Sequence, residues 1–129
     1  FKWNKKELYT VLKNKGTLNY KILSKLNKIL NIRSKQPAFH PNATQFTLNL
    51  GNNIFGIWRQ DKKREQSIFS ITNITSKTVL LSLEKVNLIE TEKWFDLISG
   101  NSLESIKNKI SIKPYQSLWI SNYKTDKKN

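Results

Sequence analysis

Apolar residues recur at helical spacing near the start of the chain. One apolar face is formed by Leu8, Val11 and Leu12. Gly16 then interrupts the pattern. Asn4 and Glu7 stand three residues apart, which is the spacing of a capping box at a helix N-terminus. The pattern predicts a short helix over residues 5–14.

A second amphipathic helix is predicted after Gly16, with Thr17 as its cap. Its apolar stripe consists of Leu18, Ile22, Leu26, Ile29 and Leu30, and a separate polar stripe consists of Lys21, Lys25 and Lys28. Because most helical stability in proteins comes from packing of the apolar face, this helix needs a surface to cover it. We expect a helical segment over residues 1–36.

The stretch QPAFHPNATQ, residues 36–45, separates the helical pattern from the one that follows. Pro37 and Pro41 each disfavour helix at the preceding residue, so we predict an extended connector over 37–45. We expect the two prolines and Phe39 to turn the chain off the helix and to anchor it in the next domain. His40, the only histidine, is expected to pack or to hydrogen-bond within this hinge.

From residue 46 the pattern repeats every second residue, as in a strand with one buried face. A first strand at 46–50 and a second at 54–60 flank the turn residues Gly51-Asn52-Asn53, which predicts a hairpin. The run 66–75 is apolar on both faces, as in a central strand. Further short strands are predicted at 79–83, 94–98, 110–112 and 118–120.

Seven short strands with frequent turns favour an antiparallel sandwich. We therefore predict a mainly β fold, an antiparallel β-sandwich over residues 46–123, preceded by the short helical segment and followed by a disordered tail at 124–129. Trp58 and Trp119 fall inside predicted strands. Tryptophans can stack on sugar rings as exposed platforms, but a place in the core or at an interface fits these two positions better.

The net charge of +14 raises the question of nucleic-acid binding. Residues 1–35 carry ten Lys or Arg against Glu7 alone, whereas residues 36–123 carry ten against seven acids. The charge is thus concentrated in the helical segment, and the predicted sandwich is only weakly basic. Only Arg33, Arg59 and Arg64 among the 23 basic residues are arginines. This distribution argues against nucleic acid as the partner.

Patterns that would indicate catalysis or a cofactor are missing from the sequence. Glu90 and Glu92 share a face if their segment is extended, but an exposed charged loop fits them better than a catalytic pair. Ser-His-Asp catalysis would have to use His40 as its base, but the sequence contains no Gly-x-Ser-x-Gly nucleophile motif. No zinc or phosphate-loop spacing occurs, so no metal or other cofactor is expected. The absence of cysteine is compatible with the cytoplasm, and no apolar run approaches the length of a membrane span.

Several ordered segments resemble the C-terminal region of glycoside hydrolase family 13, the alpha-amylase superfamily. They are residues 26–45 with Arg33 and PAFHPNA, FGIWR at 55–59, the strand 67–73 that ends in Asn, WFDLISG at 94–100, and PYQ at 114–116 before Leu118-Trp119. The closest likeness is to the sucrose phosphorylase and glucosylglycerate phosphorylase branch. It covers residues 5–122.

This resemblance implies that residues 1–36 are the tail of a (β/α)8 barrel and that 46–123 form the Greek-key β-sandwich called domain C. The catalytic carboxylates of the family lie on barrel strands upstream, and a full barrel needs about 250 residues. No catalytic residue is therefore carried over. The implied function is that of a non-catalytic fragment that stabilises the barrel of an α-glucoside phosphorylase or glucosyltransferase, with retaining α-glucosyl transfer in the intact enzyme.

Two alternatives of other classes stay open at this point. The sandwich can be a carbohydrate-binding module, or the basic leader can bind nucleic acid, which would make affinity fall steeply with salt. The expected partner under the first reading is the upstream catalytic barrel. Self-association through the N-terminal helix is expected where the barrel is absent.

Overall fold

The computed structural model describes residues 2–86, 93–103 and 108–122. Glu90, Glu92 and the tail at 124–129 lie outside the described residues. The chain divides into two compact units, Phe1–Ser34 and Lys35–Asn129, and each is described by itself. No helix among the described residues is both long and apolar enough to cross a membrane.

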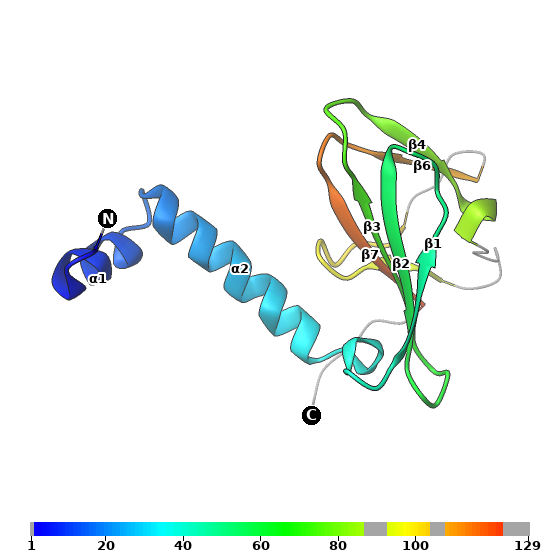
Figure 1. The fold of residues 1–129 in the computed structure, drawn as a ribbon, viewed down its shortest axis with the longest axis horizontal. Coiled ribbons are helices and arrows are strands. Elements are labelled where there is room, and N and C mark those ends of the chain that lie inside the picture. Colours follow the sequence, from blue (N-terminus) through cyan, green and yellow to red (C-terminus); the bar gives the residue numbers. More distant parts are fainter. Residues whose placement is uncertain (1, 87–92, 104–107, 123–129) are drawn as a thin grey trace. The chain divides into compact units, whose positions relative to one another are not determined.

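The first unit consists of helices α1 (Lys5–Lys13) and α2 (Leu18–Ser34) (Figure 1). Asn4 caps α1 by accepting from the backbone N–H of Lys6 at 2.9 Å. The Thr17 hydroxyl accepts from the N–H of Tyr20 at 3.2 Å and donates to the carbonyl of Val11 at 2.7 Å, so one side chain begins α2 and satisfies the end of α1. Neither helix buries any residue.

The connector between the helices and the sheets differs from the prediction in one respect. It is not extended throughout, because Pro37–Phe39 form a single 3-10 turn, η1. Gln36 before the proline is extended, as the steric restriction requires (φ −99°, ψ 115°), but proline also suits the first position of a helical turn. Phe39 and His40 close the turn through N–H bonds to the carbonyls of Gln36 and Pro37.

The second unit contains the predicted strands in two antiparallel sheets. The strands are β1 (Thr44–Leu48), β2 (Ile54–Gln60), β3 (Ser67–Asn73), β4 (Val79–Ser82), β5 (Phe95–Asp96), β6 (Lys109–Ile112) and β7 (Ser117–Ser121), with a 3-10 turn η2 (Leu83–Val86). The five-stranded sheet has the order β1-β2-β3-β7-β5, and β4 pairs with β6 in the other. The prediction of an antiparallel β-sandwich preceded by helices is confirmed.

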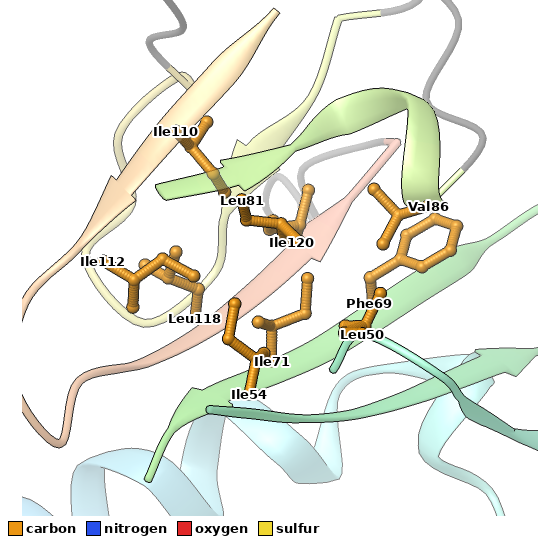
Figure 2. Packing of buried hydrophobic residues seen from close by; sticks show 10 residues of the cluster. All are labelled: Leu50, Ile54, Phe69, Ile71, Leu81, Val86, Ile110, Ile112, Leu118 and Ile120. Atoms are coloured by element: carbon orange, nitrogen blue, oxygen red, sulfur yellow. The ribbon is translucent and has the colours of Figure 1, made fainter. Parts of the chain in front are cut away.

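Packing between the two sheets forms the main core. Figure 2 shows its ten buried side chains, which are Leu50, Ile54, Phe69, Ile71, Leu81, Val86, Ile110, Ile112, Leu118 and Ile120. Each such side chain contributes about 1.5–3 kcal/mol when it is removed from water. Strand β3 is central, as predicted, and it is buried on both faces: Phe69 and Ile71 enter this core, whereas Ile68 packs on the opposite side.

Predictions at four strand ends were wrong. The first strand is Thr44–Leu48 rather than 46–50, so Leu50 lies beyond its end. Ile74 follows the end of β3 and is exposed. Leu83 lies in η2 rather than in β4. The strand predicted at 94–98 is only Phe95–Asp96, because the Asp96 carboxylate accepts from the N–H groups of Ile98 and Ser99 and turns the chain.

Candidate functional site: the corner and the sheet face beside it

Arg59 on β2 holds residues 36–40, which contain η1 and which we call the corner, against the five-stranded sheet. Its Nε donates to the carbonyl of Ala38 and its second terminal nitrogen donates to the carbonyl of His40, both at 2.8 Å. The remaining nitrogen donates to the Gln45 side chain at 2.8 Å. A planar guanidinium can serve all three acceptors at once, which a lysine cannot do. The guanidinium of Arg59 therefore has a structural role.

Gln66, which directly precedes β3, is fully buried and also binds the corner. Its Oε1 accepts from the N–H of Ala38 at 3.0 Å, and its Nε2 donates to Oε1 of Gln36 at 2.7 Å and to the hydroxyl of Ser121 at 3.3 Å. Three segments far apart in sequence therefore share one amide group. A buried polar group without a hydrogen-bond partner lowers the stability of the fold. The three bonds of the Gln66 amide therefore hold the three segments together.

An apolar cluster completes the joint between the corner and the sheet. Ala38 and Phe39 pack on Ile68, and the rings of Phe39 and Trp119 meet edge to face with centroids 4.8 Å apart. Pro37 and Pro41 are exposed at either end of this segment. Of the residues that the sequence nominated here, Phe39 is therefore an inserted anchor, and the prolines act on the backbone alone.

His40 lies at the surface. Its Nδ1 accepts from the N–H of Asn42 at 3.2 Å, so the imidazole caps the next turn and is not packed in the core. It borders an open hollow of about 320 Å³ that is also lined by Pro37, Asn42, Ala43, Asp61, Lys62, Lys63 and Glu65. The two oxygens of Asp61 accept from the backbone N–H groups of Gln66 and Lys63. These hydrogen bonds of the Asp61 carboxylate hold the loop between β2 and β3 in place.

Trp58 belongs to a row of aromatic rings on the core side of the five-stranded sheet. It stacks on Phe46 with ring centroids 5.4 Å apart and on Phe69 at 6.2 Å, and Phe69 meets Trp94 edge to face. Its indole N–H is buried, and no partner for it is present among the described residues. Trp58 and Trp119 are both half-buried. Trp58 lies between the stacked rings of Phe46 and Phe69, which leaves no open ring face for a sugar.

Two further buried polar residues, Asn73 and Asp96, occur in segments that resemble family 13, but the sequence did not predict their hydrogen bonds. Asn73 donates from Nδ2 to the carbonyls of Lys77, Ile112 and Lys113, which ties the end of β3 to the two-stranded sheet. Asp96 accepts from the N–H of Trp119 at 3.0 Å in addition to its own turn. Within the described ranges no three His, Cys, Asp or Glu side chains gather as a metal site would require.

Comparisons with known proteins identify relatives of this arrangement. No model of a protein family matches the sequence. The chain is 32% identical over 119 residues to a glucosylglycerate phosphorylase from Allomeiothermus silvanus, and the match covers 92% of this chain and 18% of that enzyme. The chain thus spans about a fifth of the length of this curated relative.

Two solved structures share the fold. An Anoxybacillus alpha-amylase superposes with a TM-score of 0.63 at 19% identity, over 88% of this chain and 25% of the amylase. A Bacillus licheniformis trehalose-6-phosphate hydrolase superposes with a TM-score of 0.59 at 20% identity, over 88% of this chain and 20% of the hydrolase. At these identities the likeness shows the fold alone.

Proposed function

Because its sequence and fold resemble the C-terminal region of glycoside hydrolase family 13 enzymes, we propose that this chain is the non-catalytic C-terminal part of an α-glucoside phosphorylase. In that enzyme the sandwich stabilises a catalytic barrel. The observation that carries the proposal is the 32% identity to a glucosylglycerate phosphorylase along 92% of the chain.

The domain organisation follows from this proposal. Residues 1–36 are the tail of the barrel, 37–45 the connector and 46–123 domain C. The hydrogen bonds of Arg59 and Gln66 support a structural role for the connector, because they hold Ala38 and His40 against the five-stranded sheet. A buried polar network of this kind is rigid when each of its members is satisfied.

The described side chains support a non-catalytic role. General acid–base catalysis needs a carboxyl or imidazole that can reach a substrate and exchange a proton. The two buried carboxylates, Asp61 and Asp96, accept from backbone N–H groups. The His40 Nδ1 caps a turn. These groups stabilise loops of the sandwich, and the chemistry is assigned to the barrel.

The α2 helix supports a place within a larger protein. Its apolar stripe residues Leu18, Ile22, Leu26 and Leu30 are 49–70% exposed. A helix with an open apolar stripe is stable only when a partner covers it. In the intact enzyme the partner is the rest of the barrel. For the chain alone we expect self-association through the same stripe.

A chimera tests the proposal. The matching 119 residues of the A. silvanus phosphorylase are replaced by those of this chain, and phosphate-dependent cleavage of glucosylglycerate is measured. We expect the chimera to fold and to retain the activity, the truncated relative to lose soluble expression, and the 129-residue chain alone to show no turnover. A truncated relative as stable and active as the chimera would contradict the stabilising role. Binding of glucans by the chain alone would favour a carbohydrate-binding module.

A further inference from the structure

Strand β1 forms one border of the five-stranded sheet, where it lies beside β2 (Figure 1). Among the described residues β1 pairs with β2 alone, and its other side, which we call the free border, has no partner strand. The first four of its five residues are exposed. The backbone N–H and C=O groups of alternate residues in a border strand point away from the neighbouring strand. The free border therefore offers backbone donors and acceptors to a further strand.

The free border lacks the features by which natural border strands avoid pairing with another chain. Those features are charged residues such as lysine, proline, and bulges that interrupt the ladder. The register of β1 with β2 runs through five consecutive partners without a bulge. Residues 42–58 contain no proline, and residues 36–58 contain no Asp, Glu, Lys or Arg in a chain of net charge +14. An approaching strand therefore meets neither a steric block nor a like charge on β1.

The other strand borders of the second unit differ from β1. The opposite border of the five-stranded sheet is β5, which has only two residues. Its outer side is occupied by a returning segment, because the N–H of Asp96 donates to the carbonyl of Asn101 at 2.9 Å and that of Leu103 to the carbonyl of Trp94 at 2.8 Å. In the two-stranded sheet, β4 and β6 have four residues each, and Lys109 lies within β6. Short strands and lysine are protective features, so the free border of β1 is the exception.

Phe46 stands at the centre of the free border. It is the middle residue of Thr44–Leu48, it is 52% exposed, and its ring stacks on Trp58 with centroids 5.4 Å apart. Trp58 stacks in turn on Phe69, and the three residues are register partners in neighbouring strands. The aromatic row therefore runs across the strands and ends at the border with a half-exposed ring. An aromatic residue on a strand beside β1 would continue this row.

We propose that the free border of β1 pairs with β1 of a second copy of this chain. The two strands run antiparallel about a two-fold axis at Phe46, so that the two Phe46 side chains face each other and Gln45 faces Thr47. This register pairs all five residues of the strand and carries the aromatic row from one sheet into the next. A two-fold axis perpendicular to the sheets keeps both cores on the same side, so the two five-stranded sheets become continuous.

A second copy is the occupant that the free border fits best. A two-fold contact requires a surface that complements itself, and an uncharged strand with an aromatic residue at its centre does so. Like charges oppose association of two chains of net charge +14, but the stretch that contains β1 carries none. The assembly closes at two copies, because the opposite border at β5 is already occupied. The contact lies wholly within the second unit and is separate from the apolar stripe of α2.

Charge exchange at position 46 tests the pairing. The background is the full chain with Ile22→Lys and Leu26→Lys, which place charges on the exposed stripe of α2 and remove association through that helix. Sedimentation equilibrium of this background should show monomers and dimers. Phe46→Lys or Phe46→Glu alone should weaken the dimer about tenfold or more, because like charges then face each other, and an equal mixture of the two variants should restore it. Leu80→Lys and Leu80→Glu, at a 65% exposed position on β4, should leave the dimer unchanged alone and mixed.

Hydrogen exchange measures the same contact without a substitution in β1. As the concentration of the background protein rises, the outward-pointing amides of residues 44–48 should exchange about tenfold or more slowly, and those of residues 79–82 should not change. A background that stays monomeric, or that forms oligomers larger than a dimer, would overturn the proposal. A dimer with unprotected β1 amides would do the same. So would a mixture of the two position-46 variants that stays monomeric although each retains the circular dichroism of the fold.

Discussion

The side chains of Gln66 and Gln36 are joined head to head, with Nε2 of Gln66 2.7 Å from Oε1 of Gln36 across thirty residues of sequence. Both residues are buried. Gln66 also binds Ala38 and Ser121, so the start of β3, the corner and β7 meet at one amide. This contact, together with the fork of Arg59, decides where the chain enters the sandwich.

Gln66→Leu should destabilise the second unit strongly. The substitution keeps the volume of the side chain but leaves the Ala38 N–H and the Gln36 amide buried without this partner. Because each unsatisfied buried group costs about 1–3 kcal/mol, we expect a loss of about 2–4 kcal/mol in the free energy of unfolding. Urea denaturation measures it. Gln45→Ala, which removes one exposed hydrogen bond, serves as the control and should cost far less.

Arg59→Lys preserves the charge and should still weaken the corner. Lysine has no planar fork and cannot reach Ala38, His40 and Gln45 together, so we expect a loss of about 1–2 kcal/mol. Arg64→Lys, at an exposed loop position, is the matched control. Equal unfolding midpoints for the two variants would show that the three bonds of Arg59 contribute no net stability.

Asn73→Asp tests the tie between the sheets. The replacement has the same shape but turns the Nδ2 donor into an acceptor that faces the carbonyls of Lys77, Ile112 and Lys113. We expect a loss of about 3 kcal/mol or more, because three acceptors lose their donor and a buried charge gains no partner. Thermal unfolding followed by circular dichroism is the measurement. Asn52→Asp in the exposed hairpin loop should have little effect.

Gly56→Ala should be destabilising through a contact within the core. A Cβ at this position would lie 2.5 Å from Cδ1 of Leu50, which is itself buried. Overpacking of this kind costs about 1–3 kcal/mol. Leu50→Val removes the clashing atom, so the double variant should lose less than the sum of the two single variants. Strict additivity would show that Leu50 moves aside without cost.

Tyr115→Gly should stabilise the 129-residue chain by about 1 kcal/mol, since glycine adopts positive φ without strain. Scanning calorimetry of the chain measures the change. A loss of stability would show that packing contacts of the Tyr115 side chain outweigh the strain of its positive φ.

The strands and helices were predictable because their signals are local. Alternation at 46–50 places Leu48 and Leu50 on one face, and the burial of Leu50 agrees with it, although Phe46 in the same set is 52% exposed and the strand is Thr44–Leu48. The run 66–75 placed β3 at the centre of the sheet, because only a strand between two neighbours and two layers buries both of its faces. Turn residues at 51–53 fixed the hairpin.

The residues that hold the corner carried no such signal. Arg59 lies at the end of the predicted strand 54–60 and Gln66 at the start of the predicted run 66–75, yet their partners lie 14–21 and 28–55 residues away in sequence. The exposure of Phe55, at 51%, was equally hidden, since the predicted strand at 54–60 did not indicate which of its apolar residues would be covered. The need for these polar groups arises only when Gln36, Ala38 and Phe39 are buried and polar groups of this segment require partners.

Periodicity and turn chemistry thus specified the elements and the antiparallel class, because both depend on neighbours within a few residues. The resemblance to family 13 was likewise visible in ordered fragments of the sequence. Only the tertiary structure decided that Gln66 and Arg59 hold the corner and that Phe55 on β2 is left exposed. Those features depend on which segments, distant in sequence, come into contact and exclude water. These contacts form only when the two sheets pack together.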